Sequence, residues 1–446
     1  MRRPPFAPGT FTWALGIEDT CVYPPDGRTP LDEHVLTDHH LNWRDDLRHS
    51  AQFGASAIRY GMSWPLVHVG PGEFDWAHLD EVVDFAVDDL GLDLVADLVH
   101  YGTPTWLTQS FADPAFPAAL TDFAGALAAR YVGRIRGYTP VNEPLTTASF
   151  SGLRGVWPPH RTGWDGWVSV AVPIAQATSQ AIAAIRLADP HAVVVHVEAS
   201  TLVSAGEPEH ACEAELLERV GWLPTDLLLG RVSTAHPMHA WLLQHGASVE
   251  TLQQLETAPP APDVVGVNYY PDLTPRRLRQ AGSRVVQVAY DGGAEGLAAV
   301  LRGFSRRYGL PLAVTETSVE GDDATRSEWL RCAVATVHDL AQEVDLRGFT
   351  WWPLLDFVDW SYASGGANVE EFAVEMLDDR GQVSVGFAPP LGHPDDGRTP
   401  FLRRMGLLRL HEQSDGSLAR VRTTAADAFA EASAAPVIIL GAAATR

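Results

Sequence analysis

The sequence predicts an α/β protein built as a single (β/α)8 TIM barrel. Short apolar runs alternate with stretches of helical spacing along most of the chain, and eight such runs can be recognised. Several of the runs end in a polar or ionisable side chain, which is typical of barrel strands that open onto a binding face. The 446 residues exceed the usual size of one domain, but a barrel with long loops reaches this length as one unit.

The predicted strands and helices follow one another in a regular order. The predicted strands are residues 11–17, 56–60, 92–99, a run that ends at 143, 192–197, 264–270, 312–315 and 348–352. Helical spacing is found at residues 42–53, 79–90, 117–131, 169–187, 296–308 and 327–343, whereas residues 201–261 are less regular. A loop-rich C-terminal segment begins at about residue 381 and carries one more predicted helix at 423–435. We therefore expect one barrel over residues 8–446.

Composition limits the partners and the compartment of the protein. The 56 acidic and 32 basic residues give a net charge of −24, which opposes binding to phosphate backbones and anionic membrane surfaces. Nucleic acid and membrane partners are therefore not expected, and the oligomeric state is left open. Cys21, Cys212 and Cys332 are odd in number and far apart, which indicates neither a disulfide framework nor a zinc ribbon. No apolar segment of a secretory signal follows the first arginines, so we expect a cytoplasmic protein.

Two glutamates are predicted to end strands of this barrel. Glu143 is part of the stretch Gly-Tyr-Thr-Pro-Val-Asn-Glu-Pro at residues 137–144, and Glu316 follows the apolar run 312–315. A carboxylate at the end of a strand is a poor core residue and a good acid/base group when a second carboxylate faces it. Each glutamate alone could equally be a helix cap or a surface ion-pair partner. The pair, on the converging ends of parallel strands, indicates a glycosidase.

Other predicted strand ends carry hydrogen-bonding and aromatic side chains. They are His100, Asn142, Asn268, Tyr270, Trp352, Asp359 and Trp360, with Arg59 below them. Sugars need this combination, because aromatic faces bind their C–H surfaces and planar polar groups bind their hydroxyls. Taken singly, His100 would more often be a core histidine and Trp352 a packing residue. His236 and His239 lack a third ligand nearby, so we expect neither a metal site nor a cofactor.

Five segments resemble motifs of the family 1 glycoside hydrolases, the β-glucosidase group. Residues 139–144 (Thr-Pro-Val-Asn-Glu-Pro) are similar to the motif with the acid/base glutamate. Residues 58–65, 98–107, 266–270 and 352–360 resemble the second-, third-, sixth- and eighth-strand motifs in that order. The resemblance covers roughly residues 10–360 and implies a barrel enzyme that hydrolyses β-glycosides. It also implies a cis peptide bond after Trp352, which Pro353 makes less costly.

The resemblance implies roles for individual residues. Glu143 is implied as the acid/base and Glu316 as the nucleophile, with Tyr270 touching it. Sugar hydroxyls are implied to bind His100, Asn142, Asp359 and Trp360, with Asn142 on the 2-hydroxyl, and Trp352 is implied as a platform near the leaving group. Asn268 is a further candidate substrate-binding residue, and Arg59 supports the nucleophile.

Three departures from the family pattern leave the sugar preference open. Glu316 is followed by Thr-Ser, where the family has Asn-Gly. The first strand lacks the sugar-binding glutamine of the family and offers Glu18 or Asp19 instead, of which we take Glu18 as the substrate-binding candidate. Asp359 is one methylene shorter than the glutamate that binds the 4- and 6-hydroxyls in the family.

We therefore expect a retaining β-glycosidase that acts on a small-molecule or oligosaccharide β-glycoside through a covalent glycosyl-enzyme. Arg59 and Tyr270 are expected to hold Glu316 ionised, while Glu143 keeps its proton to higher pH. One alternative keeps the fold, as a transglycosidase or a glycosidase that tailors natural products. The other is a non-catalytic carbohydrate-binding barrel, against which the two glutamates argue, since a binding module needs neither.

Overall fold

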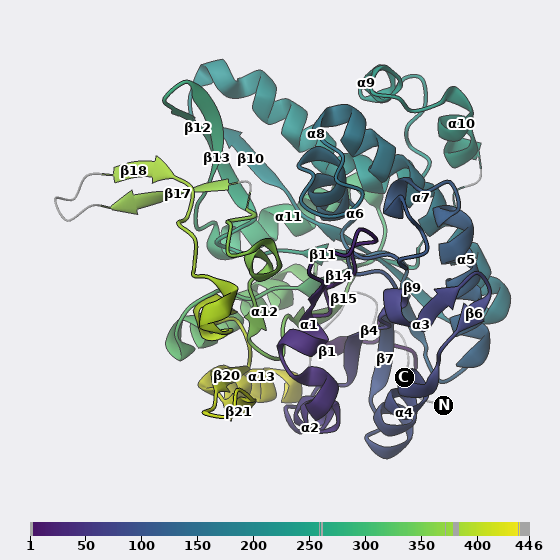
Figure 1. The fold of residues 1–446 in the computed structure, drawn as a ribbon, viewed down its shortest axis with the longest axis vertical. Helices are drawn as coiled ribbons and strands as arrows, with labels where there is room; N and C mark the ends of the chain where they lie inside the picture. Colours follow the sequence, from purple (N-terminus) through teal and green to yellow (C-terminus); the bar gives the residue numbers. More distant parts are fainter. Residues whose placement is uncertain are drawn as a thin grey trace.

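The computed structural model describes residues 3–257, 259, 262–370, 372–377, 383–435 and 437. Within them, eight parallel strands close into a barrel in the order β1-β15-β14-β11-β9-β8-β7-β4 (Figure 1). Their bounds are β1 Thr12–Gly16, β4 Ala57–Gly61, β7 Asp93–Asp97, β8 Gly137–Thr139, β9 Val193–Ala199, β11 Val264–Asn268, β14 Leu312–Glu316 and β15 Leu346–Trp351. Each of them overlaps a strand expected from the sequence. The predicted (β/α)8 barrel is confirmed.

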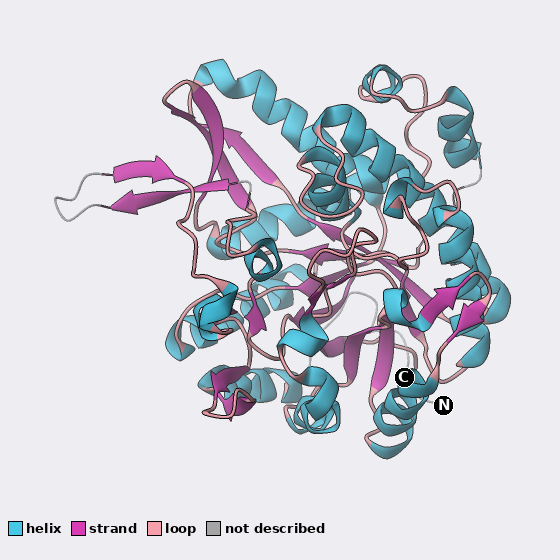
Figure 2. Cartoon of the chain, viewed as in Figure 1, coloured by secondary structure: helices cyan, strands magenta, loops and turns pink. Residues whose placement is uncertain are grey.

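An outer helix follows each barrel strand, so that helices surround the strands (Figure 2). In chain order the helices are α2 His39–Gln52, α4 Ala77–Val83, α5 Phe116–Arg130, α7 Gly163–Ala188, α8 Ala211–Leu228, α11 Gly293–Tyr308, α12 Asp323–Leu340 and α13 Thr424–Ala434. Local chemistry sets several of their ends. Asp322 accepts a hydrogen bond of 2.8 Å from the backbone N–H of Thr325 and so caps α12. Gly309 ends α11 in the left-handed region, which glycine adopts without a steric penalty.

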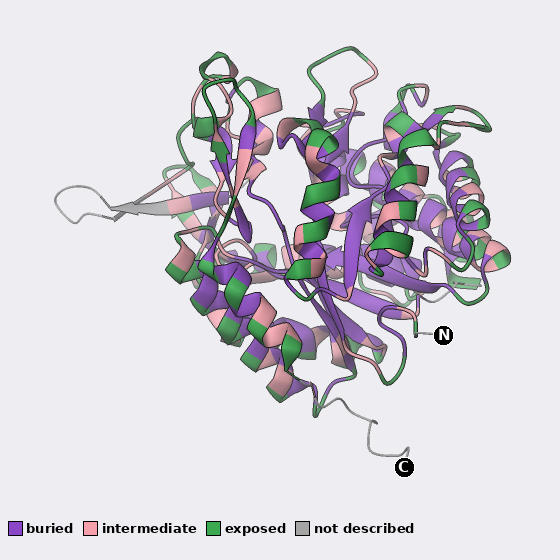
Figure 3. Ribbon diagram, turned by 90° about the horizontal axis from the view of Figure 1, so that it is seen from below, coloured by how far each residue is buried: buried purple, intermediate pink, exposed green. Residues whose placement is uncertain are grey.

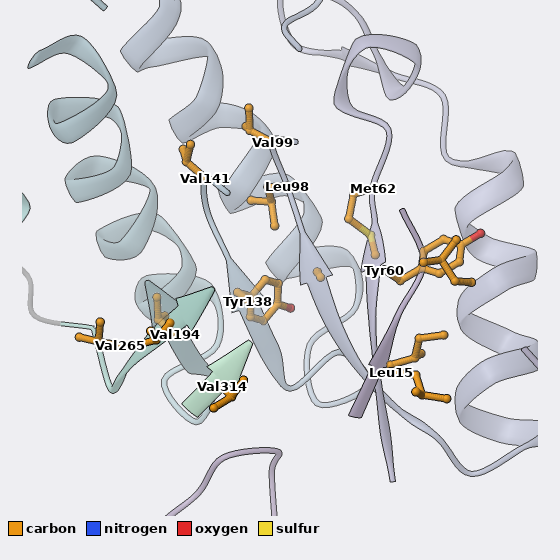
Figure 4. Packing of buried hydrophobic residues seen from close by; sticks show 14 of the residues in the cluster. Leu15, Tyr60, Met62, Leu98, Val99, Tyr138, Val141, Val194, Val265 and Val314 are labelled. Carbon is orange, nitrogen blue, oxygen red and sulfur yellow. The ribbon is translucent and has the colours of Figure 1, made fainter. Parts of the chain in front are cut away.

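The side chains of the barrel strands alternate between two buried clusters, as the period of two in a strand requires. The outward cluster packs against the helices and includes Leu15, Tyr60 and Val314 (Figure 4). The inward cluster consists of Phe6, Ala14, Ala57, Val95, Val193, Val195, Val197, Val264 and Ala313. These mostly small and β-branched side chains fill the barrel interior below the site. Figure 3 shows the buried strands inside helices whose outer faces are exposed.

The helix α7 is apolar because it is a core helix. By length and hydropathy it could span a membrane, but 61% of its most apolar stretch is buried inside the protein. It packs against α5, α8 and the short helices that follow β8. Its apolar side chains therefore already have partners within the barrel.

A second sheet stands beside the barrel, and the sequence analysis did not predict it. It contains β10 Leu202–Ala205, β12 Pro275–Ala281, β13 Arg284–Ala289, β17 Phe372–Leu377 and β18 Val383–Gly386, in that order. The strands β17 and β18 project away from the barrel (Figure 1).

Residues 201–261, whose sequence pattern is less regular, hold elements that were not predicted. These are β10, α8 and two shorter helices, α9 His239–Gln244 and α10 Val249–Thr257. Pro224 lies inside α8 and interrupts its helical pattern in the sequence, although the helix continues through it. Packing of α8 against α7 and β10 supports the helix where the local pattern does not.

Short elements occupy the connections between the barrel strands and the outer helices that follow them, except η1, which continues α4. The short strands are β2 Cys21–Val22, β3 Leu31–Asp32, β5 His68–Gly70, β6 Glu73–Phe74, β16 Phe357–Val358, β19 Leu402–Arg403, β20 Leu408–Glu412 and β21 Leu418–Arg422. The short helices are α1 Glu33–Leu36, α3 Trp64–Val67, α6 Pro144–Ala148, η1 Asp84–Asp89, η2 Ser110–Ala112, η3 Ser149–Leu153, η4 Pro208–His210, η5 Trp360–Ser364, η6 Pro394–Asp396 and η7 Thr399–Phe401. The pairing of β19 with β16 brings the C-terminal segment to the loop that follows β15.

Candidate active site

A pocket of about 150 Å³ lies at the C-terminal ends of the barrel strands. The predicted site residues that line it are Glu18, His100, Glu143, Asn268, Tyr270, Glu316, Trp352, Asp359 and Trp360. Arg59 and Asn142 are 2% and 0% exposed and lie behind this wall, where they bond to lining residues. Because parallel strands end on one face, residues far apart in the sequence converge there.

The polar residues at the base of the pocket occupy inward-facing positions of the barrel strands. Ala14 on β1 faces the barrel interior, and Glu18, four residues further on, keeps the same orientation. Ala57 on β4 faces the interior as well, and Arg59 follows two residues later. Asn268 stands in the same relation to the inward positions of β11. Side chains two or four residues apart on a strand point the same way, so the inward-facing positions are small and apolar inside the barrel and polar at the strand ends, where they face the pocket.

A shift of strand register accompanies the placement of Glu316. Val267 of β11 lies opposite Val314 of β14, but the next residue, Asn268, lies opposite Glu316. The extra residue on β14 is Thr315, whose hydroxyl donates to Oδ1 of Asn268 at 2.7 Å. An extra residue of this kind changes the direction of the side chains beyond it.

Glu143 lies at the turn between β8 and α6. Its backbone has a φ of 41°, in the left-handed region that costs a non-glycine residue about 1 to 3 kcal/mol and occurs mainly at functional sites. Its Oε1 accepts a hydrogen bond of 2.8 Å from Nδ2 of Asn268. Its Oε2 accepts a hydrogen bond of 2.7 Å from the hydroxyl of Tyr101. The carboxyl group is therefore held at both oxygens.

Glu316 is also held at both oxygens. Nη1 of Arg59 donates to Oε1 at 2.5 Å, and the hydroxyl of Tyr270 donates to Oε2 at 2.7 Å. Both contacts were expected, but the expected direction of the pKa is wrong. Burial raises the pKa of Glu316 to about 8, although the charge of Arg59 lowers it, and the charge of Glu143 adds to the rise. The loss of hydration outweighs the attraction of one guanidinium.

Arg59 connects the two carboxyl groups. Besides Glu316, its guanidinium donates through Nη2 to Oδ1 of Asn142 at 2.6 Å and to Asp97. Nδ2 of Asn142 in turn donates to the hydroxyl of Tyr101 at 3.0 Å. Burial acts to lower the pKa of Arg59, but the charges of Asp97 and Glu316 raise it above its usual value, so the side chain is a permanent cation. The predicted contact of Asn142 with a sugar 2-hydroxyl stays a prediction.

The indole of Trp352 forms one wall of the pocket. Its Nε1 donates to Oε2 of Glu18 at 2.9 Å. The imidazole of His100 stacks on it, with 5.5 Å between centroids and 2° between the planes. A Cβ on Gly16 would lie 1.8 Å from the indole, so glycine is required there. The Trp352–Pro353 peptide bond is cis, as expected.

Asp19, the other first-strand candidate, is 3% exposed and does not line the pocket. Its Oδ1 lies 2.6 Å from Nδ1 of His100, and Oδ2 of Asp97 lies 3.2 Å from the same nitrogen. Burial raises the pKa of Asp19 to about 7, although His100 lowers it. The three residues lie close enough to surround a cation, with one atom of each within 4.8 Å of the others. Since Arg59 also donates to Asp97, ion pairs within the protein already balance these charges.

Asp359 and Trp360 enter the pocket from the loop after β15. Oδ2 of Asp359 accepts a hydrogen bond of 2.9 Å from Nη1 of Arg403, which also lines the pocket. A carboxylate and a guanidinium therefore meet at this end. Trp360 contacts the rings of Tyr101 and Phe150, each at 5.4 Å between centroids. Its buried Nε1 has no partner in the part of the chain that the structure describes.

Several lining residues were missed by the sequence analysis. Tyr101 directly follows His100 in the third-strand motif, so a signal for it was present. Others come from the second sheet, which we call the side sheet (β10, β12, β13, β17 and β18), from the segment just before β17 and from the C-terminal segment. They are Arg276, Glu370, Phe372 and Arg403. They do not end barrel strands, and no periodicity marked them.

A second hollow, which we call the side hollow, adjoins the pocket. The two share Thr146, Phe150, Ala199, Ser200, Thr274, Arg276 and Glu370. The side hollow adds mostly apolar side chains, among them Leu145, Leu153, Trp164, Trp167, Leu217 and Val220. A molecule held between the two glutamates can therefore extend onto an apolar surface.

A closed barrel that brings two buried carboxyl groups, an aromatic wall and hydroxyl-binding groups into one pocket defines a glycoside hydrolase. The chain belongs to glycosyl hydrolase family 1, whose sequence model matches residues 26–298, more than half of the chain. This match includes Arg59, His100, Glu143, Asn268 and Tyr270. Glu316 and Trp352 lie beyond it, and the fold brings them to the same pocket.

The chain is similar to several glycosidases. Thermostable beta-glucosidase B of Thermobispora bispora is 27% identical over 385 residues, which are 74% of each chain. Aryl-phospho-beta-D-glucosidase BglC of Bacillus subtilis is 23% identical over 380 residues, 73% of this chain and 79% of that one. The family 1 β-glucosidase of Thermotoga maritima shares the fold, with a TM-score of 0.74 over 95% of this chain and 98% of that chain, at 16% identity. The resemblance drawn from the sequence is confirmed.

Proposed function

We propose that this family 1 hydrolase is a retaining β-glycosidase that removes a terminal β-linked sugar through a covalent glycosyl-enzyme. The observation that carries the proposal is that Glu143 and Glu316 line one pocket and are each held at both carboxyl oxygens. Retaining enzymes use two carboxyl groups about 5 to 5.5 Å apart, one as the nucleophile and one as the acid and base.

In the first step, a carboxylate oxygen of Glu316 forms a bond to the anomeric carbon. The bond from that carbon to the leaving oxygen breaks, and this oxygen takes the proton of Glu143. Arg59 stays beside Glu316 and offsets its charge before the attack. In the second step, a water molecule gives a proton to Glu143 and its oxygen displaces Glu316 from the sugar. Both carboxyl groups then return to their starting states.

The proposed cycle needs one proton on the two glutamates. Burial raises the pKa of Glu316 to about 8, the charge of Arg59 lowers it and the charge of Glu143 raises it, so this end of the pocket holds a proton more firmly than a free carboxyl group does. The reactive arrangement has this proton on Glu143 and the charge on Glu316.

The pocket wall supports sugar binding by residues on three sides. Trp352 offers an indole face, and Trp360 offers a buried N–H that has no partner within the described chain. Asp359 and Arg403 together offer an acceptor and donors to hydroxyls. Glu18 accepts from Trp352 and from the hydroxyl of Thr20 at 2.5 Å, so it both holds the platform and faces the sugar.

The side hollow supports a substrate with an apolar leaving group. Its aromatic and aliphatic side chains suit an aryl group, while Ser149, Arg154, Thr201 and Gln287 in the same lining offer donors and acceptors to hydroxyls. We therefore propose aryl β-glycosides as one substrate class, and oligosaccharides remain the other.

A fluorosugar experiment tests the proposal. The protein is mixed with a dinitrophenyl 2-deoxy-2-fluoro-β-glycoside, and we expect one equivalent of released phenol and a labelled peptide that carries Glu316. Glu316→Gln should remain unlabelled, whereas Glu343→Gln, a matched change on the exposed surface, should label normally. An α-configured first product, or turnover without a label, would remove the retaining mechanism.

The alternatives give different results with the same substrates. A transglycosidase would pass most of the sugar to an added alcohol instead of water, and the product ratio measures this. A non-catalytic barrel would release no phenol from aryl β-glycosides of glucose, galactose, mannose, fucose or xylose. The contacts that hold the two glutamates favour a catalytic barrel over a non-catalytic one, and the product ratio then separates hydrolysis from transfer.

We also propose a cytoplasmic location. It is supported by the three thiols, which are unpaired, one buried and two exposed. Fractionation of expressing cells with an antibody to the protein checks this proposal.

A further inference from the structure

Glu143 is held by a tyrosine to which the proposed mechanism gives no part. Tyr101 follows β7, lines the pocket and is 2% exposed. Its hydroxyl lies 2.7 Å from Oε2 of Glu143 and 3.0 Å from Nδ2 of Asn142. The hydroxyl thus stands between the proposed acid/base and a residue bound to Arg59.

The direction of these hydrogen bonds follows from Arg59. A guanidinium only donates, so the atom of Asn142 at 2.6 Å from Nη2 must be the carbonyl oxygen. The amide nitrogen of Asn142 then faces Tyr101 and donates to its hydroxyl oxygen. The hydroxyl proton of Tyr101 is therefore free to point to Glu143.

The backbone and the neighbouring rings fix the ring of Tyr101. Its φ is 71°, so a bulky residue is held in the left-handed region, which is uncommon outside functional sites. A Cβ on the next residue, Gly102, would lie 1.8 Å from the carbonyl oxygen of Cys21, which keeps this loop close to β2. Trp157 and Trp360 pack on the ring, at 4.9 and 5.4 Å between centroids.

The charges around the hydroxyl keep it protonated. Burial, together with the charges of Glu143 and Glu316, raises the pKa of Tyr101 well above its usual value. The other titratable groups that face Glu143 are Glu198 at the end of β9 and Tyr270 after β11. Burial is the first cause that raises the pKa of both, and a carboxyl group or a phenol brings no positive charge to Glu143 in either protonation state. The raised pKa of Tyr101 keeps its hydroxyl protonated, so that it can donate to Glu143.

We propose that Tyr101 is a positioning residue of this enzyme, which holds Oε2 of Glu143 in place and joins it through Asn142 and Arg59 to Glu316. This inference rests on the proposed role of Glu143 as the acid and base. In that role the carboxyl group must meet the leaving oxygen as its bond breaks. A donor to one oxygen leaves the carboxyl group less free to turn, and it stabilises the ionised form that remains after the proton has left.

Replacement of Tyr101 by phenylalanine tests the inference, because it removes the hydroxyl and keeps the ring. For a phenyl β-glycoside, whose leaving group needs the proton, we expect kcat/KM to fall about tenfold or more. For a dinitrophenyl glycoside the change should stay below about threefold. The basic limb of the pH profile of kcat/KM should move up by about 1 pH unit, because the ionised carboxylate loses a donor.

Tyr131→Phe is the matched control. Tyr131 is 2% exposed and donates to the carboxylate of Asp80 at 2.9 Å, outside the pocket. This variant reports the effect of losing a buried tyrosine–carboxylate hydrogen bond, and its pH profile should equal that of the wild type. If Tyr101→Phe keeps both the wild-type profile and the wild-type dependence on leaving group, the inference is overturned.

A second variant keeps the hydroxyl, in case the phenylalanine variant does not fold. Replacement of Tyr101 by 3-fluorotyrosine makes the phenol a stronger acid and so a stronger donor. The basic limb should then move to lower pH, and an unmoved limb overturns the inference. Wild-type protein assayed in parallel separates the two proposals, because a wild type without turnover overturns the function itself.

Discussion

Arg59 donates a hydrogen bond of 2.5 Å to Glu316, and the two side chains are only 3% and 4% exposed. The same guanidinium donates to Asn142, whose amide supports Tyr101 and thereby Glu143. One buried cation therefore stabilises both carboxyl groups of the pocket. It also limits the cost of placing them close together, since each would otherwise be an unpaired buried charge.

Arg59→Lys should lower kcat/KM for aryl β-glycosides by about a hundredfold or more. A lysine ammonium is a single point charge and cannot serve Glu316, Asp97 and Asn142 at their present positions. Steady-state kinetics with a dinitrophenyl glycoside measure the loss. Arg130→Lys is the control, because Arg130 binds Asp80 through two nitrogens on the exposed surface and should tolerate the change. Comparable activity of the two variants would argue against the central role of Arg59.

Glu143→Gln should affect poor leaving groups far more than good ones. The amide cannot give a proton, and general acid catalysis contributes about 10²- to 10⁴-fold when the leaving group needs it. We expect a loss in this range for alkyl β-glycosides and a loss below about tenfold in the first step for dinitrophenyl glycosides. Glu81→Gln is the control, since Glu81 pairs with Arg44 on the exposed surface, away from the pocket and the side hollow. A uniform loss over all leaving groups would point to a structural role for Glu143.

The pH dependence of kcat/KM should show a basic limb near pH 8. Burial raises the pKa of Glu316 to about 8, although the charge of Arg59 lowers it. Since the proposed mechanism needs one proton on the two glutamates, loss of a proton from the site near this pH leaves none for the leaving oxygen. A substrate that needs no proton, such as a dinitrophenyl glycoside, should keep its rate to higher pH. An identical limb for both substrates would contradict the assignment.

Glu316→Gln should stabilise the protein at alkaline pH. The folded-state pKa of Glu316, about 8, lies above its ordinary value of 4.5, so between these values the folded protein holds a proton that the unfolded chain releases. Wild-type stability therefore falls as the pH rises through this window, and the uncharged amide removes this loss.

Thermal melts at pH 5, 7 and about 9 measure the effect. We expect the midpoint of Glu316→Gln to exceed that of the wild type by a gap that widens with pH. Glu343→Gln is the control, because Glu343 is an exposed partner of Arg302 and should show no widening gap. A gap that is constant over the three pH values would mean that the titration of residue 316 does not govern it.

The strands and most outer helices of the barrel could be predicted because their signals are local. Apolar runs such as the one before Glu316 are buried on both faces, so they stand out against the amphipathic helices between them. The strands β12 and β13 were missed because they pair as a hairpin with partly exposed side chains and show no comparable run. The helix α8 was missed because Pro224 breaks its pattern.

Some residues of the site could also be predicted from their sequence neighbours, and others could not. Strand ends supplied Glu143, Asn268 and Trp352, because the polar residue directly follows an apolar run. The pocket residues Arg276 and Arg403 lie on the side sheet and in the C-terminal segment, and nothing in their sequence neighbourhood marks them. The direction of the pKa of Glu316 was also out of reach, because it depends on how far burial outweighs Arg59.

The sequence by itself determined the barrel and the family and pointed to Glu143 and Glu316 as candidates, since strand periodicity and residue order are properties of short segments. Only the tertiary structure decided that Tyr101 bonds to Glu143, that Arg59 links both carboxyl groups and that the side hollow adjoins the pocket. The physical reason is that side-chain direction and desolvation depend on contacts between residues far apart in the chain. Such contacts leave no periodic trace in any one segment.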